Sequence, residues 1–105
     1  MEFVYGYQEA LVPVSARQAL TVDNTVGGVS LTLPTSAVAA FCRLETAQIR
    51  FTIDGTAPTT TVGTLLEIGE TLDLHGRNEL TGFKAIRTGG TSGTLQAEFS
   101  KVKVS

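Results

Sequence analysis

Two side chains in this 105-residue chain have intrinsically reactive chemistry, and each occurs once: Cys42 and His75. A cysteine or serine hydrolase needs its nucleophile held against a base, and that base must be oriented by a third group. His75 lies in a polar segment with Gly, Arg and Asn, whereas Cys42 lies in an apolar stretch where a small buried residue is the ordinary interpretation. No local signature joins the two residues, so the sequence predicts no catalytic site.

Metal binding is not predicted either. A zinc site needs several Cys or His ligands, and only these two candidates are present. Asp54 opens a segment that superficially resembles a calcium loop, yet it offers one carboxylate where such loops use several. We interpret Asp54-Gly55 as a turn in which the carboxylate accepts backbone N–H groups. No metal and no cofactor is expected.

Other polar groups carry little weight as catalytic candidates. Four carboxylates could in principle pair for glycoside hydrolysis: Glu67, Glu70, Asp73 and Glu79. Acidic residues are common on solvent-facing strand positions, so their presence is weak evidence. The glycine-rich segment 88–93 lacks the Lys and the following helix of a phosphate-binding loop. The chain is therefore not expected to be an enzyme.

The sequence pattern predicts that strands position these residues. Apolar and polar residues alternate over short segments separated by Gly, Thr, Asn and Asp, which is the pattern of antiparallel strands. The expected strands are residues 16–22, 29–33, 38–45, 49–53, 65–68, 71–74, 83–87 and 94–99. Residues 65–68 and 71–74 are either two short strands or one strand bent at Gly69. We predict an all-β fold: an antiparallel β-sandwich or jelly roll of about eight short strands, with no helix of three turns. The length suits one domain over residues 1–105.

Several connections follow from the same pattern. Residues 10–13 are expected to form a short connection before the strand that begins at residue 16, and residues 75–79 a polar loop. Residues 83–87 and 94–99 are expected to pair as a hairpin, because only six small residues separate them.

The N-terminal segment concentrates aromatic residues. Phe3, Tyr5 and Tyr7 alternate, so an extended chain would point all three rings to one side. Residues 1–9 are either an ordinary first strand that packs on the core or an arm that docks on a neighbouring subunit. At the other end, Lys101 and Lys103 alternate with Val in the C-terminal tail. Because termini are the segments freest to reach a neighbour, these five residues are the candidate interface residues.

Charge and hydropathy exclude several classes of partner. The net charge is −2 and no basic tract is present, so direct nucleic-acid binding is not expected. No apolar stretch approaches the roughly 18 residues of a membrane helix. The first residues lack a secretory signal, and the single cysteine cannot form an internal disulfide. Synthesis in a cytoplasm is the expectation.

The chain from residue 37 onward resembles small virion proteins of tailed bacteriophages. The likeness covers about two-thirds of the chain and includes residues 37–45. The motifs that carry it are Ile49-Arg50-Phe51, Asp54-Gly55-Thr56-Ala57-Pro58-Thr59, Gly63-Thr64-Leu65-Leu66, Phe83-Lys84-Ala85-Ile86-Arg87 and Gly89-Gly90-Thr91. The resemblance implies a capsid decoration or cement protein on the virion surface, with the major capsid protein and further copies of itself, as a trimer, for partners. A position in the tail, neck or head fibre is the alternative within the virion.

A second resemblance leads to a different class. The phrase Phe51-Thr52-Ile53-Asp54-Gly55-Thr56-Ala57-Pro58-Thr59 is similar to one in the chitobiase-type C-terminal β-sandwich modules of carbohydrate-active enzymes. It implies a carbohydrate- or receptor-binding accessory module. The chain departs from that pattern because it has no Trp, and its only two Tyr lie at the N-terminus. The shared phrase is evidence of a common hairpin geometry more than of a common function.

Overall fold

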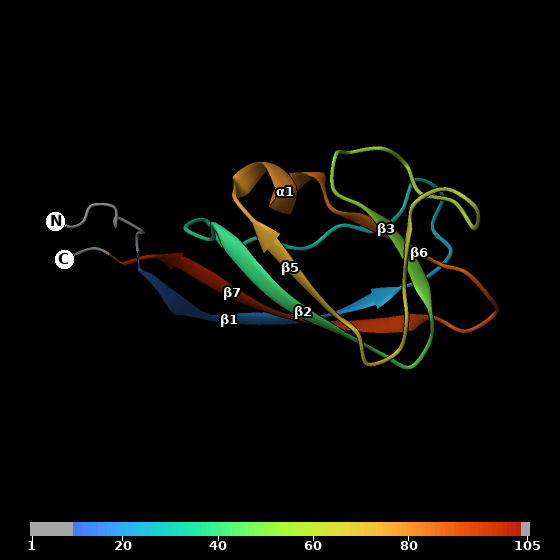
Figure 1. Ribbon diagram of the computed structural model, residues 1–105, viewed down its shortest axis with the longest axis horizontal. Helices are drawn as coiled ribbons and strands as arrows, with labels where there is room; N and C mark the ends of the chain where they lie inside the picture. The colour runs from blue at the N-terminus through green and yellow to red at the C-terminus, as the bar shows by residue number, and fades with distance from the viewer. Residues whose placement is uncertain (1–9, 104–105) are drawn as a thin grey trace, which may run out of the picture.

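A computed structural model describes residues 10–103 of the chain, and these residues form two antiparallel sheets that face each other (Figure 1). The larger sheet has the order β1-β7-β2-β5 and the smaller has the order β4-β3-β6. The elements are β1 (Leu11–Val22), β2 (Ala39–Glu45), β3 (Ile49–Thr52), β4 (Thr64–Leu66), β5 (Thr71–His75), α1 (Arg77–Gly82), β6 (Lys84–Arg87) and β7 (Gly93–Val102). The predicted all-β sandwich is confirmed.

The core lies between the facing sheets. Alternate residues of the larger sheet point inward, and Leu44, Leu95 and Phe99 are almost completely buried. Ile49 and Phe83 meet them from the side of the smaller sheet. Burying one such side chain contributes roughly 1.5–3 kcal/mol, so this inner layer supplies the main stabilisation of the fold.

Strands β1 and β7 form a long ribbon that runs the length of the molecule. They pair antiparallel from Leu11↔Val102 to Val22↔Gly93, with an irregularity between Pro13 and Arg17. The N–H of Lys103 donates to the carbonyl of Ala10 (2.9 Å), so both ends of the described chain lie at one end of the sandwich (Figure 1). The expectation that residues 10–13 form a connection is wrong, because they pair with the end of β7.

The segment 29–33 does not form the predicted strand. Its ladder is limited to one isolated bridge, Val29↔Ala85. The N–H of Thr32 donates to the side-chain oxygen of Gln18 (2.9 Å) instead of to a strand partner. Leu31 nevertheless lies in the core. The predicted burial of Leu31 is therefore correct, and the predicted strand is wrong.

The expected hairpin between residues 83–87 and 94–99 is also wrong. Strand β6 pairs with β3 in the smaller sheet, whereas β7 pairs with β1 and β2 in the larger one. The connection between them therefore crosses from sheet to sheet. The connection ends at Gly93, the first residue of β7, where a Cβ would lie only 2.7 Å from the carbonyl oxygen of Ala47. That close approach explains why glycine stands at this crossing.

Residues 75–79, predicted as a polar loop, instead lead into the single turn and a half of α1. The carboxylate of Glu79 accepts the N–H of His75 (2.8 Å), which fixes the entry to the helix. Leu80 then enters the core with only 1% of its surface exposed. One apolar anchor is too little for a periodic helical signal in the sequence, which is why the helix was missed.

Candidate interaction surface

Cys42 and His75 do not form a catalytic pair. Cys42 points into the core from β2 and is fully buried, and burial raises the pKa of its thiol to about 12. It pairs with Leu72, whereas His75 pairs with Ala39 and is exposed on the opposite face of the sheet. The interpretation of Cys42 as a small buried residue is confirmed.

The acidic candidates mostly shape loops. Glu67 accepts a bond from the side-chain amide of Gln48 (2.7 Å), and Glu70 accepts the N–H of Glu67 (2.8 Å). Glu79 holds the start of α1, as described above. Across residues 10–103, no group of three or more His, Cys, Asp or Glu side chains is arranged to hold a metal ion.

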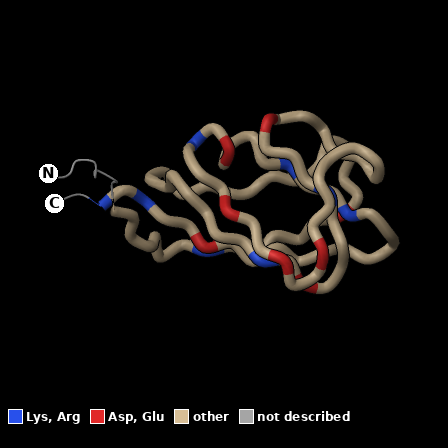
Figure 2. Tube along the Cα trace, viewed as in Figure 1, with Lys and Arg blue, Asp and Glu red and all other residues tan. Residues whose placement is uncertain are grey.

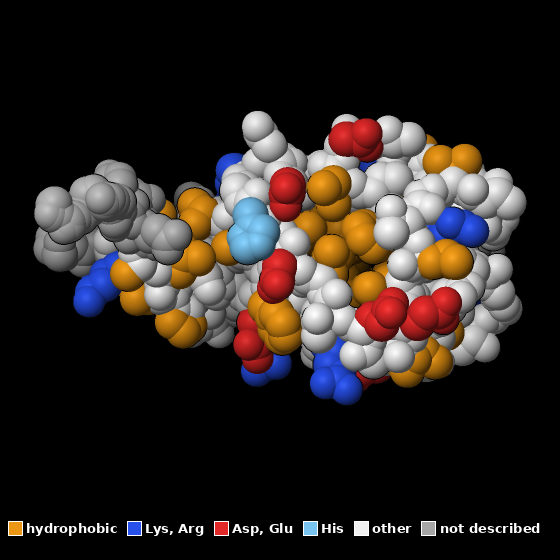
Figure 3. Space-filling view, in the orientation of Figure 1, with side chains coloured by type: hydrophobic (Ala, Val, Ile, Leu, Met, Phe, Trp, Pro, Cys, Tyr) orange, Lys and Arg blue, Asp and Glu red, His pale blue; other side chains and the backbone are white. Residues whose placement is uncertain are grey.

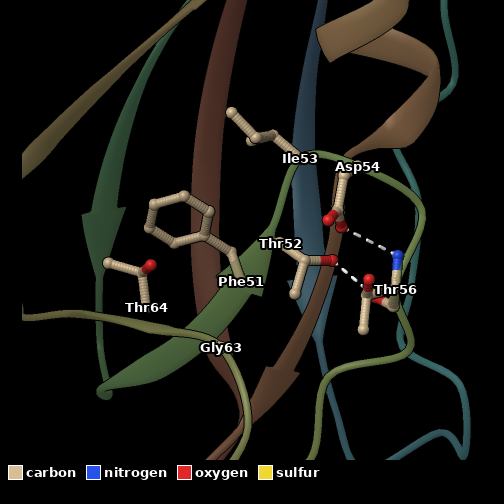
Figure 4. Close-up of a pocket in the computed structure, with 7 residues that line it drawn as sticks. All are labelled: Phe51, Thr52, Ile53, Asp54, Thr56, Gly63 and Thr64. Carbon is tan, nitrogen blue, oxygen red and sulfur yellow. Dashed lines mark hydrogen bonds between the residues drawn. The ribbon is translucent and has the colours of Figure 1, made fainter.

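The Asp54 turn is built as the sequence predicts. Asp54 accepts the N–H of Thr56 (3.0 Å), and the hydroxyl of Thr52 donates to the carbonyl of Thr56 (2.6 Å; Figure 4). Hydrogen bonding to Thr56, first of all to its backbone N–H and then to its side chain, lowers the pKa of the Asp54 carboxyl. The carboxylate is therefore engaged by its own loop.

An open depression of about 300 Å³ borders this turn (Figure 4). Phe51 and Ile53 point to one side of β3 and Thr52 to the other, as the alternation predicts. The Phe51 ring stacks on buried Phe83, with centroids 6.0 Å apart, so the face toward Phe83 is not free to bind a sugar. The depression is lined by polar and apolar side chains, and its one aromatic ring, Phe51, is packed on Phe83.

The outer face of the larger sheet is a more distinctive surface. One cross-strand row runs Arg17, Glu98, Phe41 and Asp73 from β1 to β5. Arg17 and Glu98 form an exposed ion pair (3.0 Å), and Phe41 beside them leaves 48% of its surface in solvent. We call the surface formed by Arg17, Phe41, Arg43, Asp73, Gln96 and Glu98 the outer sheet face.

Phe41 is the functional candidate that sequence reasoning missed. It lines a hollow of about 430 Å³ together with Arg17, Arg43 and Glu98. The sequence does contain evidence that Phe41 is exposed. Alternation along β2 puts Phe41 on the same side as Arg43 and Glu45, and buried Cys42 on the other side. Phe41 is therefore the exposed aromatic side chain of the outer sheet face, and this makes the face a candidate interaction surface.

A second surface lies at the end of the molecule where the described chain begins and ends. A groove of about 600 Å³ is lined by Leu11, Val38, Ala39, His75, Gly76, Arg77 and Val102, and we call it the terminal groove. Leu11 leaves 49% of its surface exposed there. Figure 3 shows hydrophobic side chains gathered beside the histidine at this end. The groove is thus apolar with a polar rim.

The predicted interface residues fall at this same end where they can be placed. Lys101 belongs to β7 and pairs with Val12, and the backbone of Lys103 bonds to Ala10. The alternation of the tail thus continues β7 as far as Val102, both lysines are exposed, and their role at an interface stays a prediction. The aromatic residues Phe3, Tyr5 and Tyr7 lie outside the described residues.

Within residues 10–103, no helix has the length and apolar character needed to cross a membrane. The chain was also compared with known proteins. No protein-family model, curated protein or solved structure matches it.

Proposed function

We propose that this protein is a structural component of a tailed-bacteriophage virion: a decoration or cement protein that binds the major capsid protein on the capsid surface. The proposal combines the resemblance of residues 37–99 to such proteins with a β-sandwich that presents an open sheet face. It acts as a homo-oligomer, a trimer in the simplest arrangement. It is made in the host cytoplasm and works in the virion, with no catalytic step.

The observation that supports this function best is the exposed Phe41 on the outer sheet face. Protein interfaces place aromatic residues in a desolvated centre and polar residues at the rim. Here Arg17, Asp73 and Glu98 surround the ring in the same way. A partner that covered Phe41 would remove its apolar surface from water while the charged rim fixed the orientation.

The mechanism is mechanical. The outer sheet face is backed directly by the core residues of the same strands, including Leu95 and Phe99, so it is a rigid platform. A platform that bridges neighbouring capsid subunits resists their separation. Many copies, joined to one another, add their individually modest affinities through multivalency.

Co-sedimentation tests this function. The purified protein is mixed with intact virions and with expanded capsids that lack it, and the bound fraction is measured against concentration. Saturable binding at symmetry-related positions supports the proposal, and imaging of the bound density separates the capsid from a tail, neck or head-fibre position. A folded protein that binds neither particle contradicts it.

A matched pair of variants tests the surface. Phe41→Ser removes the central ring, and we expect at least about tenfold weaker capsid binding. Val26→Ser is the control, since Val26 is 96% exposed in a turn away from this face. Equal binding by both variants would contradict the role of the outer sheet face, even if the capsid itself were the right partner.

The carbohydrate- or receptor-binding module remains the second candidate, and the depression beside Asp54 is the observation that favours it. Glycan-array binding that is lost on changing exposed Thr56 would support this candidate. Retained capsid binding by the same variant would assign the depression no part in attachment.

A further inference from the structure

The terminal groove is mainly apolar and has one cationic side chain in its lining. Arg77 lines the groove, whereas Lys101 and Lys103, at the same end of the molecule (Figure 2), alternate with Val102 and so lie on the opposite face of the sheet. The whole chain nevertheless carries a net charge of −2. A segment that fits the groove should therefore be mainly apolar and should carry no positive charge beside Arg77.

The backbone beside the groove is also open to a partner. The ladder between β2 and β7 ends at Ala39↔Ser100, although β7 continues to Val102. Ser100 offers its carbonyl to Val38 on the β2 side, and Lys103 offers its N–H to Ala10 on the β1 side. The backbone groups of successive residues in a strand point to alternate sides. The N–H and C=O of Val102 therefore point to the β2 side of β7, at a level that lies beyond the start of β2. Within residues 10–103 no strand pairs with them there.

The first nine residues of the chain have the complementary chemistry. They contain Glu2 and Glu9 and no Lys or Arg. They also contain Phe3, Tyr5 and Tyr7, whose alternation would direct all three rings to one side of an extended strand. Such a segment could place its rings on Leu11, Val38 and Val102 while its backbone bonded to β7.

We propose that the terminal groove binds residues 3–7 of a second copy of this chain. A segment binding to its own groove would have to reverse direction between Tyr7 and Leu11, and residues 8–10 include no Gly or Pro. A second copy needs no such reversal, and nine extended residues reach about 30 Å. The inference specifies the self-association included in the proposed function, but it is tested without any capsid.

Complementation between two full-length variants tests the proposal. An arm variant carries Phe3→Ser, Tyr5→Ser and Tyr7→Ser and keeps an intact groove. A groove variant carries Leu11→Glu and keeps an intact arm; Leu11 is half exposed at the start of β1, so the substitution leaves the core untouched. In sedimentation-velocity experiments we expect each variant alone to self-associate at least about tenfold more weakly than the natural chain. A mixture of the two should form a complex, because one intact arm meets one intact groove.

Two further measurements keep the test decisive. Ile68→Glu, at another exposed apolar position, is the control for added charge and should self-associate normally. Self-association should also slow hydrogen exchange of the Val102 amide by at least about tenfold, with little change at Lys103, whose N–H is already bonded. If Leu11→Glu unfolds the protein, the arm variant titrated with a synthetic peptide of residues 1–9 replaces the mixture, and binding is expected.

Three outcomes would overturn the proposal. The first is self-association that survives in both variants. The second is a monomeric natural chain in which only the arm variant binds the added peptide, because the chain's own segment would then occupy the groove. The third is absence of peptide binding to the folded arm variant. Loss of capsid binding with self-association intact would instead contradict the proposed function alone.

Discussion

The rings of Phe51 and Phe83 stack with their centroids 6.0 Å apart and their planes 26° from parallel. Phe51 belongs to β3, whereas Phe83 directly follows α1 and precedes β6. The pair therefore joins the smaller sheet to the only helix in the described part of the chain. Because Phe83 is fully buried, the packing between α1 and the smaller sheet depends on its ring.

We expect Phe83→Ala to lower the free energy of unfolding by about 3–5 kcal/mol, because it removes a buried ring and leaves a cavity beneath Phe51. Urea unfolding followed by circular dichroism measures the change. Phe41→Ala is the matched control: its ring is half exposed on the outer sheet face, and its effect should be below about 1.5 kcal/mol. Equal effects would mean that the two rings are not buried to different extents.

Gly82 is the last residue of α1, and it lies close to the backbone of Ile53 and Gly55. A Cβ there would collide with the carbonyl oxygen of Ile53, which cannot move easily because Gly55 of the same loop bonds to the Gly82 carbonyl (3.0 Å). We expect Gly82→Ala to destabilise the protein by about 1–3 kcal/mol. Gly89→Ala is the control, because a Cβ at Gly89 meets nothing within 4 Å. Thermal unfolding of both variants should show a lower midpoint for Gly82→Ala alone.

Burial of Cys42 predicts a specific pH dependence. Its thiol pKa is raised from 9.0 to about 12, so the folded protein holds this proton when the unfolded chain has already lost it. The stability that this difference contributes is complete below pH 9 and is lost as the pH rises towards 12. Cys42→Ala should show a flatter decline of unfolding free energy over that range. In the native protein at pH 8, the thiol should react with a thiol-specific reagent only as fast as the chain unfolds.

The Asp54 carboxyl has the opposite linkage. Its pKa is lowered by the hydrogen bonds to Thr56, so the folded state releases this proton more readily than the unfolded state. The resulting stability is present above the ordinary value of 3.8 and is lost as the pH falls through the lowered pKa. Titration followed by NMR should give a midpoint below 3.8 for Asp54. Thr56→Pro, which removes the donor N–H, should move the midpoint back upward, and an unchanged midpoint would assign the shift to another cause.

The sequence was sufficient for the fold class and for several local structures, because these depend on neighbours along the chain. Alternation located β2 and β3, and Asp54 with Gly55 identified a turn whose hydrogen bond lies within three residues. Strand partners depend on contacts that alternation does not encode. For this reason residues 83–87 and 94–99, adjacent in the sequence, were wrongly paired with each other.

The candidate surfaces were predictable to a smaller extent. Lys101 and Lys103 were named as interface residues from their place in the tail, but their attachment to β1 depends on a partner at the other end of the chain. Phe41 was overlooked because an isolated Phe in an apolar segment usually belongs to the core. Only the register of β2 against β7 and β5 shows which residues share its face.

The pairing of β1 with β7 also sets the order in which the molecule can form. Leu11 lies opposite Val102, so the larger sheet cannot close until nearly the whole chain is available. Contacts between such distant residues carry a large loop-closure entropy before they are rewarded, which slows folding. During synthesis, β2 and β5 can pair early, but the position between β1 and β2 stays empty until β7 leaves the ribosome. Nascent chains interrupted before residue 93 should therefore expose the inner faces of β1 and β2 and depend on chaperones for their solubility.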